Sequence, residues 1–196
     1  MITTRRSKRH GSKAVKIVVT GPFAAGKTTV IRTISEITVL STERGITDES
    51  SSVKPGTTVA MDFGRITIDS ELVLYLFGTP GQQRFEFMWE ILSDGMLGFI
   101  LVVDTQDPSS FEDAAHILAS FTDLAQVPFV VAANRCSTLD PVTEHAIRQT
   151  LHLGLSTPIV ACDVTDRESV KSVLLSLLFG VLDQIEAYTT SGAGRI

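Results

Sequence analysis

Residues 21–28 read Gly-Pro-Phe-Ala-Ala-Gly-Lys-Thr. They follow the apolar run Val15 to Val19 and precede residues 29–37, whose apolar side chains recur at helical spacing. A strand, a GxxxxGK[ST] loop and a helix in this order are typical of a phosphate-binding P-loop. The glycines of such a loop let consecutive backbone N–H groups surround the phosphates, and the helix N-terminus adds a partial positive charge. The stretch therefore predicts a site for the phosphates of a nucleotide.

Two side chains of this loop have specific roles in that chemistry. Lys27 is expected to reach the β- and γ-phosphates, and the hydroxyl of Thr28 is expected to hold Mg²⁺. The alternative is a glycine-rich turn that binds no phosphate. The residues of the loop expected to contact a nucleotide are Gly21, Ala24, Ala25, Gly26, Lys27, Thr28 and Thr29.

The length and composition of the chain suit one globular domain. It has 196 residues, of which 43% are hydrophobic and 20% are charged. The charge is unevenly distributed, because the first 16 residues hold six of the 17 Lys and Arg residues and no acidic residue. We expect residues 1–13 to form a basic tail, residues 14–189 to form the domain, and residues 190–196 to form a flexible C-terminal tail.

The basic tail has two interpretations. A polar, basic segment without apolar periodicity is typical of a disordered, solvated tail. The alternative is an electrostatic arm for anionic lipid, nucleic acid or an acidic partner. Because the tail lacks the apolar stretch of a signal peptide, we do not expect export, and we expect a cytoplasmic protein. We expect no specific nucleic-acid partner. Peripheral binding to the inner face of the membrane stays open.

The cysteine content and the apolar runs exclude other classes. Cys136 and Cys162 are too few for a disulfide scaffold and lack a metal-binding spacing, so we expect reduced packing residues rather than redox groups. The longest apolar stretch, residues 173–182, is too short to span a bilayer.

Apolar runs alternate with helical patterns along the chain. This order predicts a P-loop α/β fold with a six-stranded, mostly parallel sheet, one antiparallel edge strand and helices on both faces. Ligands of such sheets bind at the carboxyl ends of the strands. Strands are predicted at residues 14–20, 59–68, 71–77, 97–104, 128–134 and 158–161, and helices near residues 27–37, 82–93, 109–125, 141–152 and 166–188.

Three segments need separate comment. The second and third strands are joined at Asp69-Ser70 and are expected to form an antiparallel hairpin. The polar segment 41–58 before them is long enough to be functional or mobile. The final helix is apolar on more than one face, so packing against the sheet edge and binding a partner are both open.

Three stretches at this spacing carry a family resemblance: residues 21–29, Thr57-Thr-Val-Ala-Met-Asp-Phe-Gly64, and Leu76-Phe-Gly-Thr-Pro-Gly-Gln-Gln-Arg-Phe85. Together they resemble the Ras-like small GTPases over about residues 14–188. The chain is more similar still to the bacterial MglA-like branch, in particular to conservon CvnD-type ATP/GTP-binding proteins. The resemblance implies a small G-protein fold that binds GTP/GDP with Mg²⁺.

Carried over residue by residue, the resemblance implies roles for three more positions. Thr58 would close on Mg²⁺ and the γ-phosphate, so that the triphosphate orders its loop. Gly81 would offer its N–H to the γ-phosphate, and Gln82 would orient the attacking water. Gln82 could instead be an ordinary residue at the start of a surface helix. The candidate catalytic residues are then Gln82, Lys27 and Thr58, and the candidate metal ligands are Thr28 and Thr58.

The chain departs from the family at the metal. The family's aspartate that holds Mg²⁺ through water is Gly78 here, and losing an anionic oxygen ligand should weaken Mg²⁺ binding. Asp62 is a candidate substitute, because a tight turn at Asp69-Ser70 places it opposite residue 77 or 78, depending on the loop length. The alternative is that Asp62 is an ordinary edge-strand or switch residue.

A second departure concerns the nucleotide base. The family's NKxD motif, which reads guanine, is Asn134-Arg-Cys-Ser137 here. The neutral Ser137 does not replace a carboxylate that accepts hydrogen bonds from guanine, so base discrimination should fall. Arg135 could still stack on the base. The resemblance also places Ala161 and Cys162 in the loop that supplies a backbone N–H to the base.

Three other side chains bear on these departures. Asp140 and Asp163 could replace the lost carboxylate, or they could be ordinary turn and helix-cap residues. Phe23 occupies a loop position that is glycine in Ras itself. A bulky side chain there should obstruct activation, so we expect slow intrinsic hydrolysis.

Two hypotheses about function follow. The first is a nucleotide-dependent switch in a bacterial signalling module, which hydrolyses GTP slowly and has, by resemblance, a roadblock-fold regulator and a sensor kinase as partners. The alternative is a pseudo-GTPase, or a purine-nucleotide-binding module with relaxed base specificity and little hydrolysis. A small-molecule P-loop kinase is disfavoured, because the Gly81-Gln82 pair would have no role in it.

Overall fold

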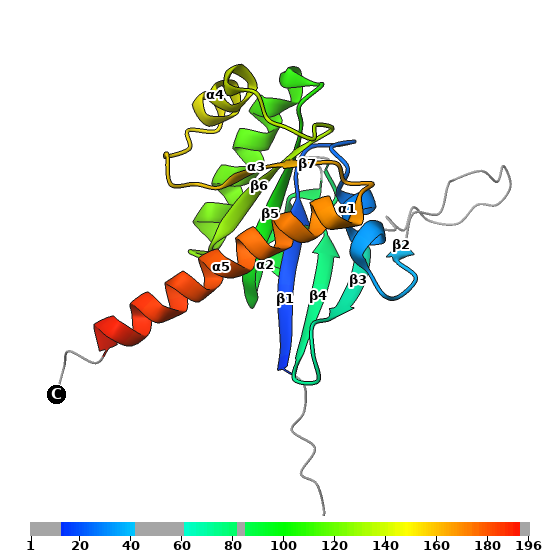
Figure 1. Ribbon diagram of the computed structural model, residues 1–196, viewed down its shortest axis with the longest axis vertical. Coiled ribbons are helices and arrows are strands. Elements are labelled where there is room, and N and C mark those ends of the chain that lie inside the picture. The colour runs from blue at the N-terminus through cyan, green and yellow to red at the C-terminus, as the bar shows by residue number, and fades with distance from the viewer. Residues whose placement is uncertain (1–12, 42–60, 82–84, 193–196) are drawn as a thin grey trace, which may run out of the picture.

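The computed structural model describes residues 13–41, 61–81 and 85–192. At its centre is a seven-stranded sheet in the order β2-β3-β4-β1-β5-β6-β7 (Figure 1). Neighbouring strands from β4 to β7 are parallel, whereas β3 is antiparallel to both β2 and β4. The strands are β1 (Lys13–Thr20), β2 (Leu40–Ser41), β3 (Asp62–Thr67), β4 (Leu72–Gly78), β5 (Met96–Asp104), β6 (Phe129–Asn134) and β7 (Ile159–Cys162).

Helices cover both faces of this sheet (Figure 1). One core lies between the sheet and α1 with α5, and the other lies between the sheet and α2, α3 and α4. The helices are α1 (Lys27–Ile34), α2 (Phe87–Ser93), α3 (Phe111–Leu124), α4 (Pro141–Thr150) and α5 (Arg167–Gly192), and a short 3₁₀ turn, η2 (Pro108–Ser110), precedes α3. The predicted α/β class, with helices on both faces, is confirmed.

The two cores explain why the central strands read as continuous apolar runs. In β1, Ile17 and Val19 face α1 and α5, whereas Val18 faces the other three helices. Residues 98–104 of β5 are all buried. A strand that is covered on both faces needs apolar side chains in both orientations, so it shows no polar alternation.

The six predicted strands are all present, and the sheet has one strand more. The additional strand is β2, which has two residues and pairs with β3. It is the edge strand, whereas the sequence predicted β3 at this edge. So short a strand carries no periodic signal in the sequence. β3 begins at Asp62 rather than at residue 59.

The hairpin between β3 and β4 has a three-residue loop. Thr67 pairs with Val73, and the Ile68 N–H donates to the carbonyl oxygen of Leu72 at 2.9 Å. Asp69 stabilises the turn, because its Oδ1 accepts from two backbone N–H groups of the following residues at 2.6 and 2.9 Å. This register places Asp62 opposite Gly78, which is one of the two expected positions.

The final helix differs from its prediction in position and in length. α5 lies across a face of the sheet, where it contacts β5, β6 and β7, rather than against the sheet edge. Gly98 allows the close approach, because a Cβ there would be 2.9 Å from Leu177 Cδ1. The helix continues to Gly192, past the expected domain boundary at residue 189. Residues 185–190, near its C-terminal end, are all exposed.

Two other helices are shorter than predicted. α1 ends at Ile34, because Ser35 is extended (φ −63°, ψ 139°) while its N–H still donates to the Ile31 carbonyl oxygen. α2 begins at Phe87, and residues 82–84 of the predicted helix lie outside the described residues.

Candidate functional site

The P-loop connects β1 to α1 at the carboxyl end of the central strand. Gly21, Ala24 and Gly26 have positive φ angles of 141°, 61° and 110°. A side chain at Gly21 would collide with the carbonyl oxygen of Val102 on β5, and a Cβ at Gly26 would be 2.7 Å from Asn134 Nδ2. The path of the backbone therefore requires both glycines of the motif.

Lys27 begins α1 and is almost buried, with 9% of its surface exposed. Its Nζ donates to the carbonyl oxygen of Pro22 at 2.6 Å, so the ammonium group lies within its own loop. Gly81, which follows β4, lies directly against this loop. A Cβ at Gly81 would be 2.5 Å from Lys27 Nζ and 2.7 Å from the backbone nitrogen of Phe23. The fold thus brings together the loop lysine and the glycine that the sequence assigned to the γ-phosphate.

Thr28 meets a carboxylate from another strand. Its Oγ1 donates a hydrogen bond to Asp62 Oδ2 on β3. The Asp62 side chain also lies over Gly78, because a Cβ at Gly78 would be 3.0 Å from Asp62 Cβ and 3.4 Å from Oδ2. The carboxylate of Asp62 therefore occupies the space beside the P-loop that a side chain at position 78 would enter.

The residues around Thr28 fit a hard cation. A hydroxyl and a carboxylate are oxygen ligands of the kind that Mg²⁺ prefers, and Mg²⁺ with a nucleotide uses one or two protein ligands plus phosphates and water. Within residues 13–41, 61–81 and 85–192, no group of three or more His, Cys, Asp or Glu side chains could hold a metal. Thr28 and Asp62 therefore suit a metal shared with a nucleotide rather than a site built by the protein alone.

Asn134 connects the P-loop to the loops that follow β6 and β7. It is 3% exposed at the end of β6. Its Nδ2 donates to the carbonyl oxygen of Ala25 at 2.8 Å, and its Oδ1 accepts from the backbone N–H groups of Arg135 at 2.7 Å and Val164 at 3.2 Å. The amide thus makes three hydrogen bonds with backbone groups, and it holds the P-loop against the loops that follow β6 and β7.

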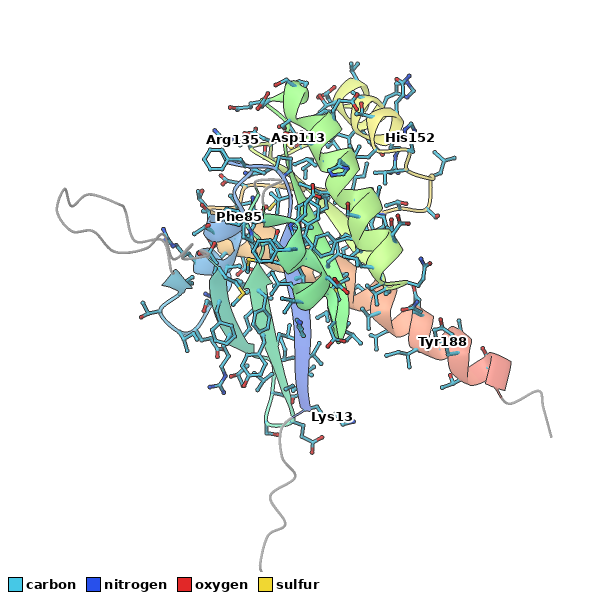
Figure 2. All side chains as sticks on the ribbon, turned by 180° about the vertical axis from the view of Figure 1, so that it is seen from behind. Lys13, Phe85, Asp113, Arg135, His152 and Tyr188 are labelled. Carbon is cyan, nitrogen blue, oxygen red and sulfur yellow. The ribbon has the colours of Figure 1, made fainter. Side chains whose placement is uncertain are left out.

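Arg135 is held by a carboxylate that the sequence reasoning missed. It has a φ of 67°, and its Nε lies 2.8 Å from Asp104 Oδ2 at the end of β5. The Asp104 side chain is 12% exposed and its Oδ1 also accepts from the Gln106 N–H at 2.9 Å. Figure 2 shows Arg135 at the end of the molecule opposite to Lys13, where β1 begins. An acidic residue that ends a central strand next to the ligand edge was the available signal.

The loops that follow β6 and β7 lie side by side. The Cys136 N–H donates to the carbonyl oxygen of Cys162 at 3.4 Å, and Ala161 precedes it on β7. Ser137 is exposed. The arrangement therefore brings together Asn134, Arg135, Ala161 and Cys162, as the sequence predicted for the base end of the site.

The two cysteines are packing residues, as expected. Cys162 is 1% exposed within the core that faces α1 and α5, whereas Cys136 packs against the core on the opposite face. Burial raises the pKa of the Cys162 thiol, so its reactive thiolate form is disfavoured.

Asp140 and Asp163 have local structural roles. Asp140 is the N-cap of α4, and its Oδ1 accepts from the N–H groups of Val142 and Thr143, both at 3.0 Å. Asp163 Oδ1 accepts from the N–H and the hydroxyl of Thr165 at 2.9 and 2.6 Å. These hydrogen bonds lower the pKa of both carboxyl groups. The interpretation as cap and turn residues is confirmed.

Several predicted residues lie outside the described part of the chain. They are Thr58 and Gln82, most of the segment 41–58, and residues 1–12 of the basic tail. Phe23 is described and is 69% exposed, and its backbone nitrogen lies beside Gly81. In the residues that the structure describes, no helix is both long enough and apolar enough to cross a membrane.

Comparisons with known proteins identify a family and several relatives. Residues 40–184, which begin after the P-loop, match the model of a family described as conserved hypothetical ATP binding protein. An uncharacterized protein of Methanocaldococcus jannaschii is 31% identical over 127 residues, which are 64% of this chain and 73% of that protein.

Two further relatives are named as a Ras-related protein and as an ADP-ribosylation factor-like protein. Ras-related protein SEC4 of Candida albicans is 27% identical over 129 residues, which cover 62% of this chain and 60% of that protein. ADP-ribosylation factor-like protein 3 of Saccharomyces cerevisiae is 24% identical over 136 residues, which cover 68% of this chain and 65% of that protein. The chain therefore spans less than two thirds of the length of these two relatives.

Proposed function

The chain belongs to the family described as conserved hypothetical ATP binding protein, and from this membership and its P-loop we infer that it binds a nucleotide there. We propose that it is a nucleotide-dependent molecular switch, which binds GTP and GDP with Mg²⁺ and hydrolyses GTP slowly. Its similarity to Ras-related and ADP-ribosylation factor-like proteins supports a switch rather than a metabolic kinase.

The observation that carries this proposal is the position of Gly81 against the P-loop. A Cβ at Gly81 would lie 2.7 Å from the backbone nitrogen of Phe23 and 2.5 Å from Lys27 Nζ, so the backbone after β4 comes as close to the loop backbone as only glycine allows. A γ-phosphate bound by Lys27 and by the Gly81 N–H would hold this segment in place. Loss of the phosphate would release the segment, and such an order change is how a switch communicates with a partner.

Mg²⁺ binding is proposed with a rearranged ligand set. Thr28 supplies the hydroxyl, Asp62 supplies the carboxylate that Gly78 lacks, and Thr58 is the further ligand implied by resemblance. The contact between Thr28 Oγ1 and Asp62 Oδ2 supports this set. When bound, the metal neutralises charge that develops on the phosphate oxygens.

Slow hydrolysis is proposed from the residues around the γ-phosphate position. Gln82 would orient the attacking water, whereas the bulky Phe23, whose backbone nitrogen lies beside Gly81, would restrict access to it. In phosphoryl transfer most catalysis comes from positioning and charge stabilisation, so a bulky obstruction there lowers the rate.

A purine-nucleotide-binding module with relaxed base specificity and little hydrolysis is the second candidate. Ser137 is exposed and neutral, while Asp140 and Asp163 are engaged in a cap and a turn. Arg135, fixed by Asp104, presents a planar guanidinium, and stacking on a guanidinium does not distinguish guanine from adenine.

The biological setting is proposed from the resemblance to MglA-like and CvnD-type proteins alone. We expect a cytoplasmic protein of a bacterial signalling module with a roadblock-fold regulator and a sensor kinase. The basic tail would add peripheral contact with an anionic membrane surface.

Nucleotide binding and phosphate release test the proposal together. Binding of GTP, GDP, ATP and ADP, with and without Mg²⁺, is measured by the fluorescence of Trp89, the only tryptophan, which is buried in α2. We expect Mg²⁺-dependent binding with preference for guanine nucleotides, and slow phosphate release that Gln82→Ala abolishes. Gln83→Ala is the matched control and should retain release.

The outcomes separate the two candidates. Tight binding of all four nucleotides without phosphate release favours the binding module. If none of the four nucleotides binds, and the Lys27→Ala variant behaves identically, both candidate functions are contradicted.

A further inference from the structure

Two threonine hydroxyls meet where β1 and β4 end. Thr20 is the last residue of β1, and Thr79 directly follows β4. Both residues are buried, with 0% and 4% of their surface exposed. The Thr79 hydroxyl donates to Thr20 Oγ1 at 2.9 Å, and the Thr79 N–H donates to the carbonyl oxygen of Val19 at 3.0 Å. The segment that leaves β4 is therefore attached to the end of β1 by two hydrogen bonds.

This hydroxyl pair lies next to the two segments that form the proposed phosphate site. Thr20 precedes Gly21, the first residue of the P-loop, and Thr79 lies two residues before Gly81. The two segments stay in contact beyond the pair, because a Cβ at Gly81 would be 2.8 Å from the carbonyl carbon of Pro22. Both segments therefore run side by side from the hydroxyl pair to the position proposed for the γ-phosphate.

The sheet fixes the Thr20 side of the hydroxyl pair. Thr20 pairs with Leu101 of β5 in the parallel ladder. A side chain at the next residue, Gly21, would collide with the carbonyl oxygen of Val102 on the same strand. Thr20 therefore offers Thr79 a partner whose position is determined by the neighbouring strand.

Stability alone does not require these two hydroxyls. Core positions close to them on the two strands hold apolar residues, among them Val18, Val19 and Leu76. Replacing both partners of a hydrogen bond by apolar groups of the same shape can cost almost no stability, and valine has the shape of threonine. A hydrogen bond differs from an apolar contact because it prefers a defined distance and direction. The hydroxyl pair therefore suits a place where a backbone segment has to be held in one position.

We propose that the hydroxyl pair positions Gly81 to bind the γ-phosphate, an inference that rests on the function proposed above. Thr20 and Thr79 are positioning residues, because both are buried and act through the backbone of residues 79–81. The pair holds this backbone against the P-loop, so less ordering is needed when the Gly81 N–H meets the phosphate. It therefore raises the affinity for GTP and leaves the affinity for GDP, which has no γ-phosphate, unchanged.

Valine variants of the two residues test this role in the full chain. Thr20→Val, Thr79→Val and the double variant are compared by chemical denaturation. Each single variant should lower the free energy of unfolding, because it leaves one buried hydroxyl without its partner. The double variant should recover most of that loss, because neither hydroxyl is then left unpaired.

Nucleotide affinity gives the readout that a purely structural role would not change. The affinities for GDP and for a non-hydrolysable GTP analogue are measured with Mg²⁺ for the same variants. The preference for the GTP analogue over GDP should fall about three- to tenfold in each single variant. It should stay low in the double variant, although the stability of that variant recovers.

Two further variants separate positioning from stability. Thr79→Ser keeps the hydroxyl and should retain the preference for the GTP analogue. Thr33→Val is the matched control, because Thr33 Oγ1 donates to the carbonyl oxygen of Val164 at 2.6 Å and joins α1 to the loop after β7. Loss of this hydrogen bond should lower stability without changing the preference.

The possible results are distinct. A double variant that keeps the preference of the unmodified protein would overturn the inference, because the hydroxyls would then serve stability alone. Equal affinity of the unmodified protein for GDP and the GTP analogue would also overturn it, while nucleotide binding itself would stand. An unmodified protein that binds neither nucleotide contradicts the proposed function, and the inference falls with it.

Discussion

Asp62 and Gly78 face each other across the antiparallel pair of β3 and β4. Side chains of directly opposite residues emerge on the same face of a sheet. A carboxylate could therefore reach Thr28 from either strand, but side chains at both positions would be crowded, since a Cβ at Gly78 would be 2.9 Å from Ile31 Cδ1 and 3.0 Å from Asp62 Cβ. Glycine at position 78 therefore leaves room for the Asp62 side chain.

Variants at positions 62 and 78 test whether the Asp62 carboxylate binds Mg²⁺. Asp62→Asn should weaken Mg²⁺-dependent nucleotide binding about 10- to 100-fold, because the charge is lost while the shape is kept. The double variant Asp62→Gly/Gly78→Asp should recover part of this loss. Binding is followed in Mg²⁺ titrations, and Glu71→Gln, an exposed acidic residue of the same hairpin, is the control. Unchanged Mg²⁺ dependence in Asp62→Asn would remove Asp62 from the ligand set.

Phe23 gives a second prediction at this scale. Because Phe23 is 69% exposed, Phe23→Ala should not lower the melting temperature, while it removes the bulky side chain from the loop beside Gly81. We expect intrinsic GTP hydrolysis to rise about three- to tenfold, a change of about one kcal/mol in the barrier. Phosphate release in single turnover measures it. A rate equal to that of the unmodified protein would show that Phe23 does not obstruct the reaction.

Helix α4, at the carboxyl edge of the sheet, begins with a side-chain cap. Asp140 ends the loop after β6 and caps α4, and Pro141 at the first helical position needs no N–H partner. The hydrogen bonds from Thr143 are the main cause of the lowered pKa of Asp140. Asp140, a candidate to replace the carboxylate that binds guanine in the family, is thus engaged in hydrogen bonds at the start of α4.

Removal of this cap should have a pH-dependent effect. Asp140→Ala should lower the melting temperature by about 2–4 °C at neutral pH, since it leaves two N–H groups of the first turn without the cap. The pKa of Asp140 in the folded protein lies below 3.8. Its stabilisation is therefore complete above pH 3.8 and is lost as the pH falls through the folded-state pKa.

Thermal melts of both proteins over a pH series measure this effect. The difference between them should shrink below pH 3.8. A difference that stays constant there would mean that the cap does not depend on the carboxylate charge. Asp123→Ala, at an exposed position in the last turn of α3, is the control without a cap.

Across the whole molecule, Asn134 joins segments that are far apart in sequence. Its bond to Ala25 spans 109 residues, and its bond to Val164 spans 30 residues. Through one buried amide, the P-loop is tied to the loops that follow β6 and β7. The two ends of the proposed nucleotide site are therefore fixed relative to each other.

Asn134→Ala should destabilise the fold and the site together. It leaves the Ala25 carbonyl oxygen and the Val164 N–H buried without this partner, and we expect a loss of about 2–4 kcal/mol in the free energy of unfolding. Chemical denaturation measures the loss. Ser137→Ala, an exposed change in the same loop, should stay within about 0.5 kcal/mol. Equal stability of the two variants would contradict the connecting role.

The sequence by itself determined the P-loop, the order of strands and helices, and the α/β class. These features depend on residues close together in the chain, whose glycine spacing and apolar periodicity report directly on local backbone conformation. The same reasoning identified Asp140 as a cap candidate, because a cap acts within one helical turn. It also restricted the partner of Asp62 to two positions.

Only the tertiary structure decided which residues meet across the sheet. The three-residue loop placed Asp62 over Gly78, strand order placed Asp104 beside Arg135, and the length of α5 relative to the sheet left its C-terminal end projecting. Each of these depends on register or on distance between elements. Strand register and the distances between elements are set by packing of the whole chain, so a pattern of neighbouring residues does not predict them.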